Sequence, residues 1–164
     1  MTTTLKHNET LSPNPTADLR ESLGEPILLK LALDGVQTLD PFKLKSSVGG
    51  KTALRPQMML TLLSYCYAAR IYGSRDIEWA IRNNATVRYI CARTYPEWLA
   101  IRQFRRHNRE LLEQCLAYVL KRAWLLQSDD CTSDWVSPES DWRFVAEARQ
   151  KIEVAIIMDT AESD

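Results

Sequence analysis

The sequence predicts an all-α protein, a compact bundle of short helices with a helix-turn-helix-like element and no sheet. The first reason is periodicity, because apolar residues recur at helical spacing and no segment alternates convincingly as a strand does. The second is punctuation, because proline, glycine and capping residues start and stop the apolar runs repeatedly. With 164 residues, 45% of them hydrophobic, the chain suits one domain with its own core, plus tails.

The first helices are short and follow a polar segment. Residues 1–13 are polar and are expected to form a disordered tail. Asn14-Pro15 is typical of a cap followed by proline at the first helical position, and Gly24 is expected to end that helix. Pro26 then begins a second short helix, which Gly35 is expected to end.

Residues 46–51 (SSVGGK) form a loop by composition, and Thr52 follows them. A phosphate-binding loop needs an earlier glycine five positions before the one that precedes its lysine. Lys45 stands at that position, and no buried strand precedes it. Nucleotide binding is therefore not expected.

The central helix is predicted to be the most apolar one. Arg55-Pro56 begins it, Gly73 is expected to end it, and the residues between them are apolar nearly all round, as in the middle of a bundle. Ser74 is expected to cap the next helix, and Asn84 a further short one. Tyr95-Pro96 ends that run, because the residue before a proline avoids the α region.

The segment after Pro96 is predicted to be a basic amphipathic helix. Trp98, Ile101 and Phe104 are spaced three apart and are expected to face inward. A set of arginines falls largely on the other side: Arg102, Arg105, Arg106 and Arg109.

Two longer amphipathic helices complete the chain. The run is expected to break at His107-Asn108, because Asn108 can cap a new helix that continues to about residue 126. Ser137-Pro138 begins the last helix, with acidic residues outward and an apolar stripe inward, formed by Phe144, Val145, Ala148, Ile152 and Ile156.

The net charge of zero hides a strong asymmetry along the chain. Residues 51–124 hold 13 Lys and Arg against 5 Asp and Glu, whereas residues 125–164 hold 3 against 10. A basic body with an acidic tail is typical of nucleic-acid contact, although ordinary charge mixing explains the same composition equally well.

The residues that would mark an enzyme are scarce. There are only two histidines, the four cysteines lie far apart without metal-ligand spacing, and no nucleophile motif occurs. The acids Asp129, Asp130, Asp134, Glu139 and Asp141 lack ordered spacing and are interpreted as a solvated linker. We therefore expect no enzymatic activity, no cofactor, no metal and no small-molecule substrate.

The location follows from two further absences. The N-terminus has no apolar core of signal length, and nothing approaches 18 consecutive apolar residues. Buried, reduced cysteines also suit a reducing compartment. We expect a cytoplasmic, nucleoid-associated protein without membrane contact.

Residues 55–92 and 95–120 carry a resemblance to a known family. Arg55-Pro56 precedes a long apolar helix, Gly73-Ser74-Arg75 leads into the next one, and Pro96 is followed by Phe104-Arg105-Arg106. In order and spacing these features resemble the N-terminal domain of bacterial insertion-sequence transposases of the DDE class, the InsH-like type. The resemblance spans roughly residues 25–124.

The resemblance implies a helix-turn-helix-like element that binds the terminal repeats of a transposon, with residues 97–106 as its second helix. The implied contacts to double-stranded DNA are Arg75, Trp98, Arg102, Gln103, Arg105, Arg106 and Arg109. Trp98, Leu99 and Ala100 stand where the family usually has small hydroxyl residues, which weakens or rearranges base reading.

The resemblance also implies what the chain lacks. DDE transposases hold metal ions with carboxylates of a separate catalytic domain, which would follow where this chain ends. The C-terminal VAIIMDTAESD only faintly resembles a first catalytic strand with Asp159 as its acid. The predicted organisation is a tail at 1–13, a DNA-binding domain at 14–126, an acidic linker at 127–137 and an acidic amphipathic helix at 138–164.

Three functions remain open at this point. The first is a DNA-binding protein derived from a transposase, acting as a remnant, as a regulator or as one half of a split transposase, without cleavage activity of its own. The second is a helical protein–protein interaction module, which the apolar Trp98 and Leu99 favour. The third is a catalytic subunit completed in trans by a second chain. Besides double-stranded DNA, a second copy of the protein or a transposase subunit is a further expected partner.

Overall fold

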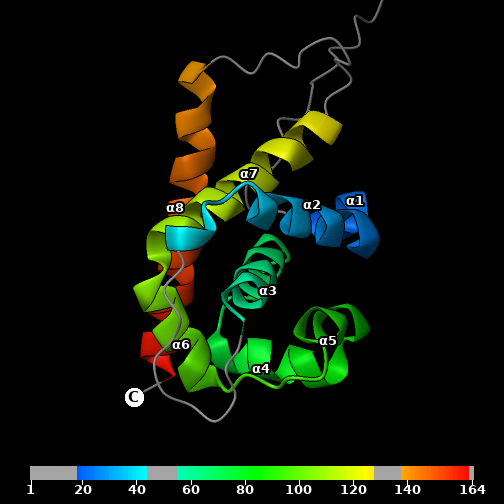
Figure 1. The fold of residues 1–164 in the computed structure, drawn as a ribbon, viewed down its shortest axis with the longest axis vertical. Helices are drawn as coiled ribbons and strands as arrows, with labels where there is room; N and C mark the ends of the chain where they lie inside the picture. Colours follow the sequence, from blue (N-terminus) through cyan, green and yellow to red (C-terminus); the bar gives the residue numbers. More distant parts are fainter. Residues whose placement is uncertain (1–17, 44–54, 128–137, 163–164) are drawn as a thin grey trace, which may run out of the picture.

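A computed structural model describes residues 18–43, 55–127 and 138–162 (Figure 1). Over these residues the chain forms eight α-helices, one 3-10 turn and no strand, which confirms the predicted all-α fold. The elements are α1 (Leu19–Leu23), α2 (Glu25–Gln37), the 3-10 turn η1 (Pro41–Lys43), α3 (Pro56–Ala68), α4 (Ser74–Asn83), α5 (Ala85–Cys91), α6 (Trp98–His107), α7 (Arg109–Gln127) and α8 (Pro138–Ala161).

Several expectations fall on segments outside the described residues. These are the tail at 1–13, the cap at Asn14-Pro15, the loop at 46–51 and the acidic linker, of which only Gln127 is described, as the last residue of α7. The side chains of residues 138–140 are also outside the description.

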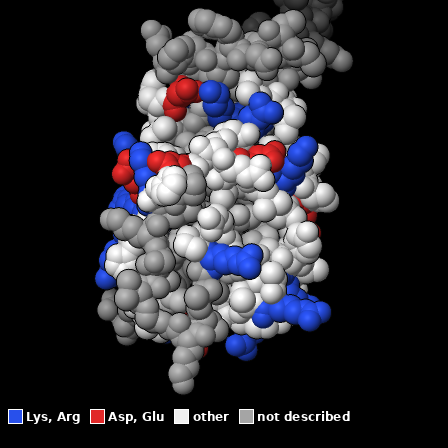
Figure 2. Space-filling view, viewed as in Figure 1, with Lys and Arg blue, Asp and Glu red and all other residues white. Residues whose placement is uncertain are grey.

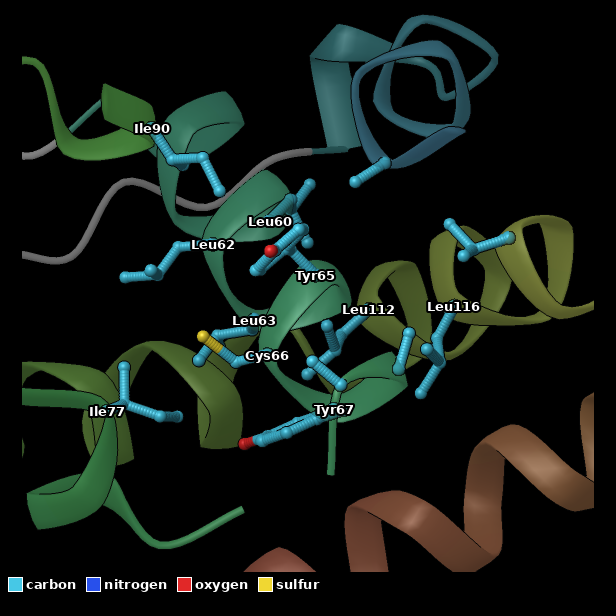
Figure 3. Close-up of a cluster of buried hydrophobic side chains, with 14 of the residues drawn as sticks. Leu60, Leu62, Leu63, Tyr65, Cys66, Tyr67, Ile77, Ile90, Leu112 and Leu116 are labelled. Carbon is cyan, nitrogen blue, oxygen red and sulfur yellow. The ribbon is translucent and has the colours of Figure 1, made fainter. Parts of the chain in front are cut away.

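Helix α3 lies at the centre of the bundle and supplies a large part of the core (Figure 3). From Met59 to Ala68 all of its side chains are buried, because it packs against α2, α5, α7 and α8 on different sides. Each buried Leu or Tyr removes apolar surface from water, at about 1.5–3 kcal/mol for a large side chain. The prediction of a central apolar helix is therefore confirmed.

The end predicted for the central helix is wrong. Helix α3 ends at Ala68, and Arg70 takes a left-handed conformation with φ of 60°, so the chain turns before Gly73 is reached. Gly73 instead flanks the start of α4 as its N-cap, and Ser74 is the first residue of that helix. The Ser74 hydroxyl caps nothing, because it donates a hydrogen bond to a distant carboxylate.

The helix end predicted at Gly35 is also wrong. Helix α2 continues through Gly35 to Gln37, and Thr38 follows it. A Cβ at Gly35 would lie 3.1 Å from Cδ1 of Tyr118 and 3.2 Å from Sγ of Cys115. The glycine therefore serves the close approach of α2 to α7 instead of ending the helix.

Two other local predictions, one cap and one helix break, are confirmed. The Asn84 side chain accepts a hydrogen bond from the backbone N–H of Val87 at 3.1 Å, which caps α5. The break between α6 and α7 falls at Asn108, as predicted. Short elements α4, α5 and α6 thus follow one another at one end of the molecule (Figure 1).

Helix α8 packs along α7 and reaches α4 and α6 with its C-terminal end (Figure 1). Phe144, Ala148 and Ile152 are buried as predicted, while Val145 and Ile156 are half-buried against the core. The faint likeness of the C-terminal segment to a catalytic strand is wrong, since α8 runs without interruption to Ala161. Asp159 therefore lies on a helix, in its last turn.

Candidate nucleic-acid interface

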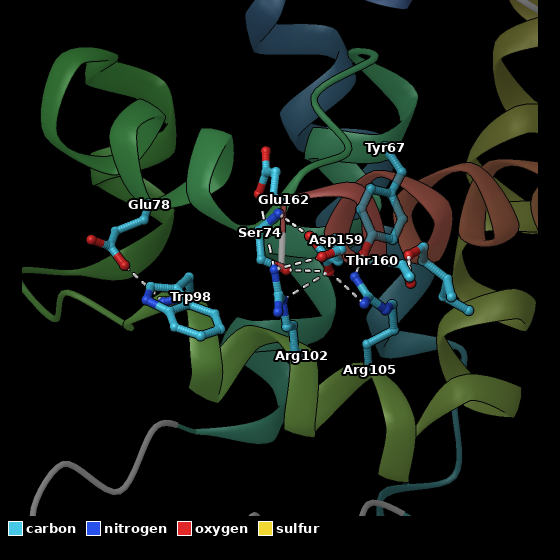
Figure 4. A network of polar contacts seen from close by, with 10 residues as sticks. Tyr67, Ser74, Glu78, Trp98, Arg102, Arg105, Asp159, Thr160 and Glu162 are labelled. Carbon is cyan, nitrogen blue, oxygen red and sulfur yellow. Dashed lines mark hydrogen bonds and ion pairs between the residues drawn. The ribbon is translucent and has the colours of Figure 1, made fainter. Parts of the chain in front are cut away.

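The carboxylate of Asp159 joins three helices that are far apart in sequence (Figure 4). It accepts hydrogen bonds from the backbone N–H and the hydroxyl of Ser74 at 2.7 and 2.6 Å, at the start of α4. It also accepts one from Nη2 of Arg105 on α6 at 2.5 Å. Only 4% of Asp159 and 6% of Arg105 are exposed, so this ion pair lies in the interior.

The other terminal nitrogen of the Arg105 guanidinium also donates a hydrogen bond. Its Nη1 donates to the hydroxyl of Tyr67 on α3 at 3.1 Å. A buried charge persists only when it is paired and hydrogen-bonded, and this guanidinium has both kinds of partner. Arg105, a predicted DNA contact, thus connects α6 to α3 and α8.

The pKa of Asp159 reflects the same contacts. Burial raises the pKa of this carboxyl, but the hydrogen bonds from Ser74 and the charge and hydrogen bond of Arg105 outweigh it. The net effect is a pKa below the usual range of an aspartate. The carboxylate is therefore a fixed negative charge at neutral pH.

Arg102 lies one turn before Arg105 and is half-buried beside the same residue. Its Nη2 donates to the backbone oxygen of Asp159 at 3.0 Å, and its Nε lies 3.5 Å from Oδ2. Its guanidinium also stands over the ring of Trp98, 4.4 Å from the centroid. The guanidinium of Arg75, from α4, lies 5.0 Å from the same centroid.

Trp98 is thereby fixed at the junction of α4 and α6. Its backbone N–H donates to Oε2 of Glu78 at 2.7 Å (Figure 4), and its ring lies near the guanidinium groups of Arg75 and Arg102. Such contacts contribute about 0.5–1 kcal/mol each at exposed sites. Trp98, predicted to face inward, is therefore only half-buried, and two arginine side chains lie against its ring.

The outward face of α6 consists of Leu99, Gln103 and Arg106, which are spaced four and three residues apart. All three side chains are exposed, and so is Arg75 on the neighbouring α4. Arg109 is exposed too and forms an ion pair with Glu153 of α8. The predicted contacts therefore divide into a buried one, Arg105, two half-buried ones, Trp98 and Arg102, and an exposed set of Arg75, Gln103, Arg106 and Arg109.

Ion pairs within the fold partly balance the charge asymmetry of the sequence. Carboxylates of α8 pair with cations of α6 and α7 at Arg105, Arg109 and Lys121, the last through Asp141 at 2.8 Å. The acidic helix thus lies on one side of the basic segment, which leaves the other side to the arginines of α4, α5 and α6.

A group of exposed basic residues on α4 and α5 was not singled out from the sequence. No Asp or Glu occurs between residues 79 and 96, and that stretch holds Arg82, Arg88 and Arg93, all exposed. Exposed Trp79 and Tyr89 lie on the same two helices. Figure 2 shows Lys and Arg side chains over the lower part of one face, where α4 and α5 lie, with most acidic side chains higher up. The absence of acidic residues from this stretch is the sequence signal that could have identified this group.

Other kinds of site find little support in the described part of the chain. No group of three or more His, Cys, Asp or Glu there could hold a metal ion. Cys66, Cys91 and Cys115 are free and buried, as expected, while Cys131 lies outside the description. Among these residues no helix has both the length and the apolar character that a bilayer crossing requires.

Comparison with known proteins gives one match. Residues 27–107 match the family model described as a transposase domain (DUF772), which extends from α2 to the last residue of α6. The match supports a transposase-related domain over just under half of the chain. Searches of curated proteins and of solved structures returned no match.

Proposed function

Given a transposase-related domain over residues 27–107, we propose that the chain binds double-stranded DNA through α6 and the adjoining face of α4. It does so as the N-terminal part of an InsH-like bacterial transposase would, contacting transposon ends without cleaving them by itself. The observation that carries the proposal is Trp98, held between Arg75 and Arg102 beside the exposed Gln103 and Arg106.

The burial pattern assigns different roles to the arginines. Arg105 supports the helix from inside, because its guanidinium is held by Asp159 and Tyr67. Arg75, Arg106 and Arg109 reach solvent and supply the phosphate contacts together with the half-buried Arg102. The Gln103 amide is the side chain on the outward face that can both donate a hydrogen bond to a base edge and accept one from it. Leu99 between them supplies apolar contact only.

Salt dependence gives the first test. Each phosphate neutralised on duplex DNA contributes about −0.9 to the slope of log affinity against log salt. Four contacts, from Arg75, Arg102, Arg106 and Arg109, give a slope of about −3.6. Between 50 and 200 mM salt the affinity should therefore fall on the order of a hundredfold.

Substitutions of exposed arginines test DNA binding more directly than substitution of Arg105, because they leave the core intact. We expect Arg75→Ala and Arg106→Ala together to lower duplex affinity at least tenfold and to reduce the salt slope by nearly two units. Arg122→Ala is the matched control, since Arg122 is exposed on α7 about 20 Å along the helix from Arg109. A flat salt response, or equal losses in the double variant and the control, would refute DNA binding through this face.

A protein–protein interaction module is the second candidate, favoured by exposed apolar side chains near α6. Leu99 is 50% exposed, Tyr95 56% and Trp79 67%. Scattered apolar residues are normal, but three on neighbouring elements can form a contact patch. Light scattering over a range of protein concentrations tests self-association, which Tyr95→Ser should weaken while duplex affinity stays unchanged.

A further inference from the structure

A cavity of about 550 Å³ lies where the C-terminal turn of α6, the first turn of α7 and the end of α8 meet. Its wall holds four guanidinium groups, from Arg102, Arg105, Arg106 and Arg109. Asp159, Thr160 and Ile156 of α8 complete the lining. The four arginines converge because Arg102 lies three and four residues before Arg105 and Arg106, and Arg109 lies four and three residues after them. The row thus continues across the break at Asn108 from α6 into α7.

The carboxylates around the cavity do not fully balance this charge. Asp159 is the one acid in the lining among the described residues, and its oxygens already accept hydrogen bonds from Ser74 and Arg105. Glu153 pairs with Arg109, and Glu162 lies 3.9 Å from Arg102, but neither is part of the wall. The lining therefore carries four positive charges against one negative charge.

We propose that this cavity binds a single tetrahedral oxyanion, a phosphate group. Planar guanidinium groups bind phosphate oxygens through paired hydrogen bonds, which a spherical anion such as chloride cannot match. A phosphate placed there also adds negative charge beside Arg106, which, unlike the other three arginines, forms no ion pair with the described residues. The group comes either from free phosphate or from the DNA backbone, and the second source rests on the function proposed above.

Inorganic phosphate is the direct probe. Titration calorimetry with the whole chain should show saturable binding in a chloride buffer of constant ionic strength. Arg106→Gln should weaken it at least tenfold, because this exposed arginine lies in the wall and forms no ion pair with the other described residues. Arg122→Gln, outside the cavity, should bind phosphate as the parent does.

A charge introduced at Thr160 separates anion binding from general stabilisation by phosphate salts. Thr160 is exposed at the cavity, and its hydroxyl donates only to the backbone oxygen of Ile156 in its own helix. We expect Thr160→Glu to raise the melting temperature in chloride, because its carboxylate occupies the arginine cavity, and to remove the further rise on adding phosphate. Thr160→Gln should keep that rise.

Competition with a duplex oligonucleotide distinguishes the two sources. Phosphate that displaces the duplex at constant ionic strength identifies a backbone phosphate as the occupant, and phosphate that binds without displacing it identifies the free anion. No saturable binding, or an equal melting-temperature rise in the parent and in Thr160→Glu, overturns the proposal. Phosphate binding without duplex binding refutes the proposed function alone, and duplex binding without phosphate binding refutes this inference alone.

Discussion

Removal of the Asp159 carboxylate should cost more stability than any surface change on α8. In Asp159→Ala the Ser74 hydroxyl and N–H lose their acceptor, and the Arg105 guanidinium, 6% exposed, keeps its charge without the carboxylate. Breaking one side of a buried ion pair costs about 3–5 kcal/mol. That is about a fifth or more of the stability of a marginal domain, at about 5–15 kcal/mol.

Urea unfolding followed by circular dichroism measures this loss, and a double-mutant cycle identifies its cause. If the unpaired charge is responsible, Arg105→Met in the Asp159→Ala background should restore at least about 2 kcal/mol, because an apolar side chain then fills the site. Glu153→Gln is the surface comparison, with an expected loss below about 1 kcal/mol, since its pair with Arg109 is exposed.

The reasoning fails under either of two results. A loss below about 1 kcal/mol in Asp159→Ala would mean that water or another carboxylate satisfies Arg105. A double variant whose loss equals the sum of the two single losses would mean that the two side chains act independently.

The remaining predictions concern pH, the core, a cap and the thiols. Because the pKa of Asp159 is lowered in the fold, its contribution to stability is present above about pH 4 and is lost as the pH falls further, so Asp159→Asn should flatten the stability curve below about pH 4. Leu63→Ala, at the fully buried centre of α3, should cost about 2–5 kcal/mol in urea unfolding. Asn84→Ala, which removes the cap of α5, should cost about 0.5–2 kcal/mol in the same assay. A thiol reagent should not modify Cys66, Cys91 or Cys115 until urea unfolds the chain. Burial encloses these thiols and raises the pKa of each, to about 11 for Cys115 and about 12 for Cys91. Reaction in the native state would contradict this.

Local signals accounted for most of the fold. Proline at residues 56 and 138, the Asn84 side chain and the break at Asn108 act within one helical turn, so their effect can be predicted from neighbouring residues. The errors at Gly35 and Gly73 have the opposite origin. At both positions the role of the glycine depends on a distant element. Beside Gly35 this element is α7, and next to Gly73 it is the end of α8, where Asp159 accepts a hydrogen bond from Ser74.

The candidate site could be predicted only in outline. Spacing correctly placed Arg106 on the outward face of α6, but it also counted the half-buried Arg102 and the buried Arg105 among the outward residues. Helical periodicity gives the angle of a side chain around its helix and not the partner that it meets. Arg105 lies at the edge of the buried face, where the neighbour decides whether a guanidinium stays in water or pairs inside.

The sequence by itself determined that the chain is helical, where most of its helices lie and that positive charge gathers on α6. Only the tertiary structure decided which charges remain available for a ligand. Asp159 meets Arg105 across 54 residues and Ser74 across 85, so no local pattern records these contacts. The physical reason is that helix formation depends on near neighbours, whereas the partner of a charge depends on how the helices pack.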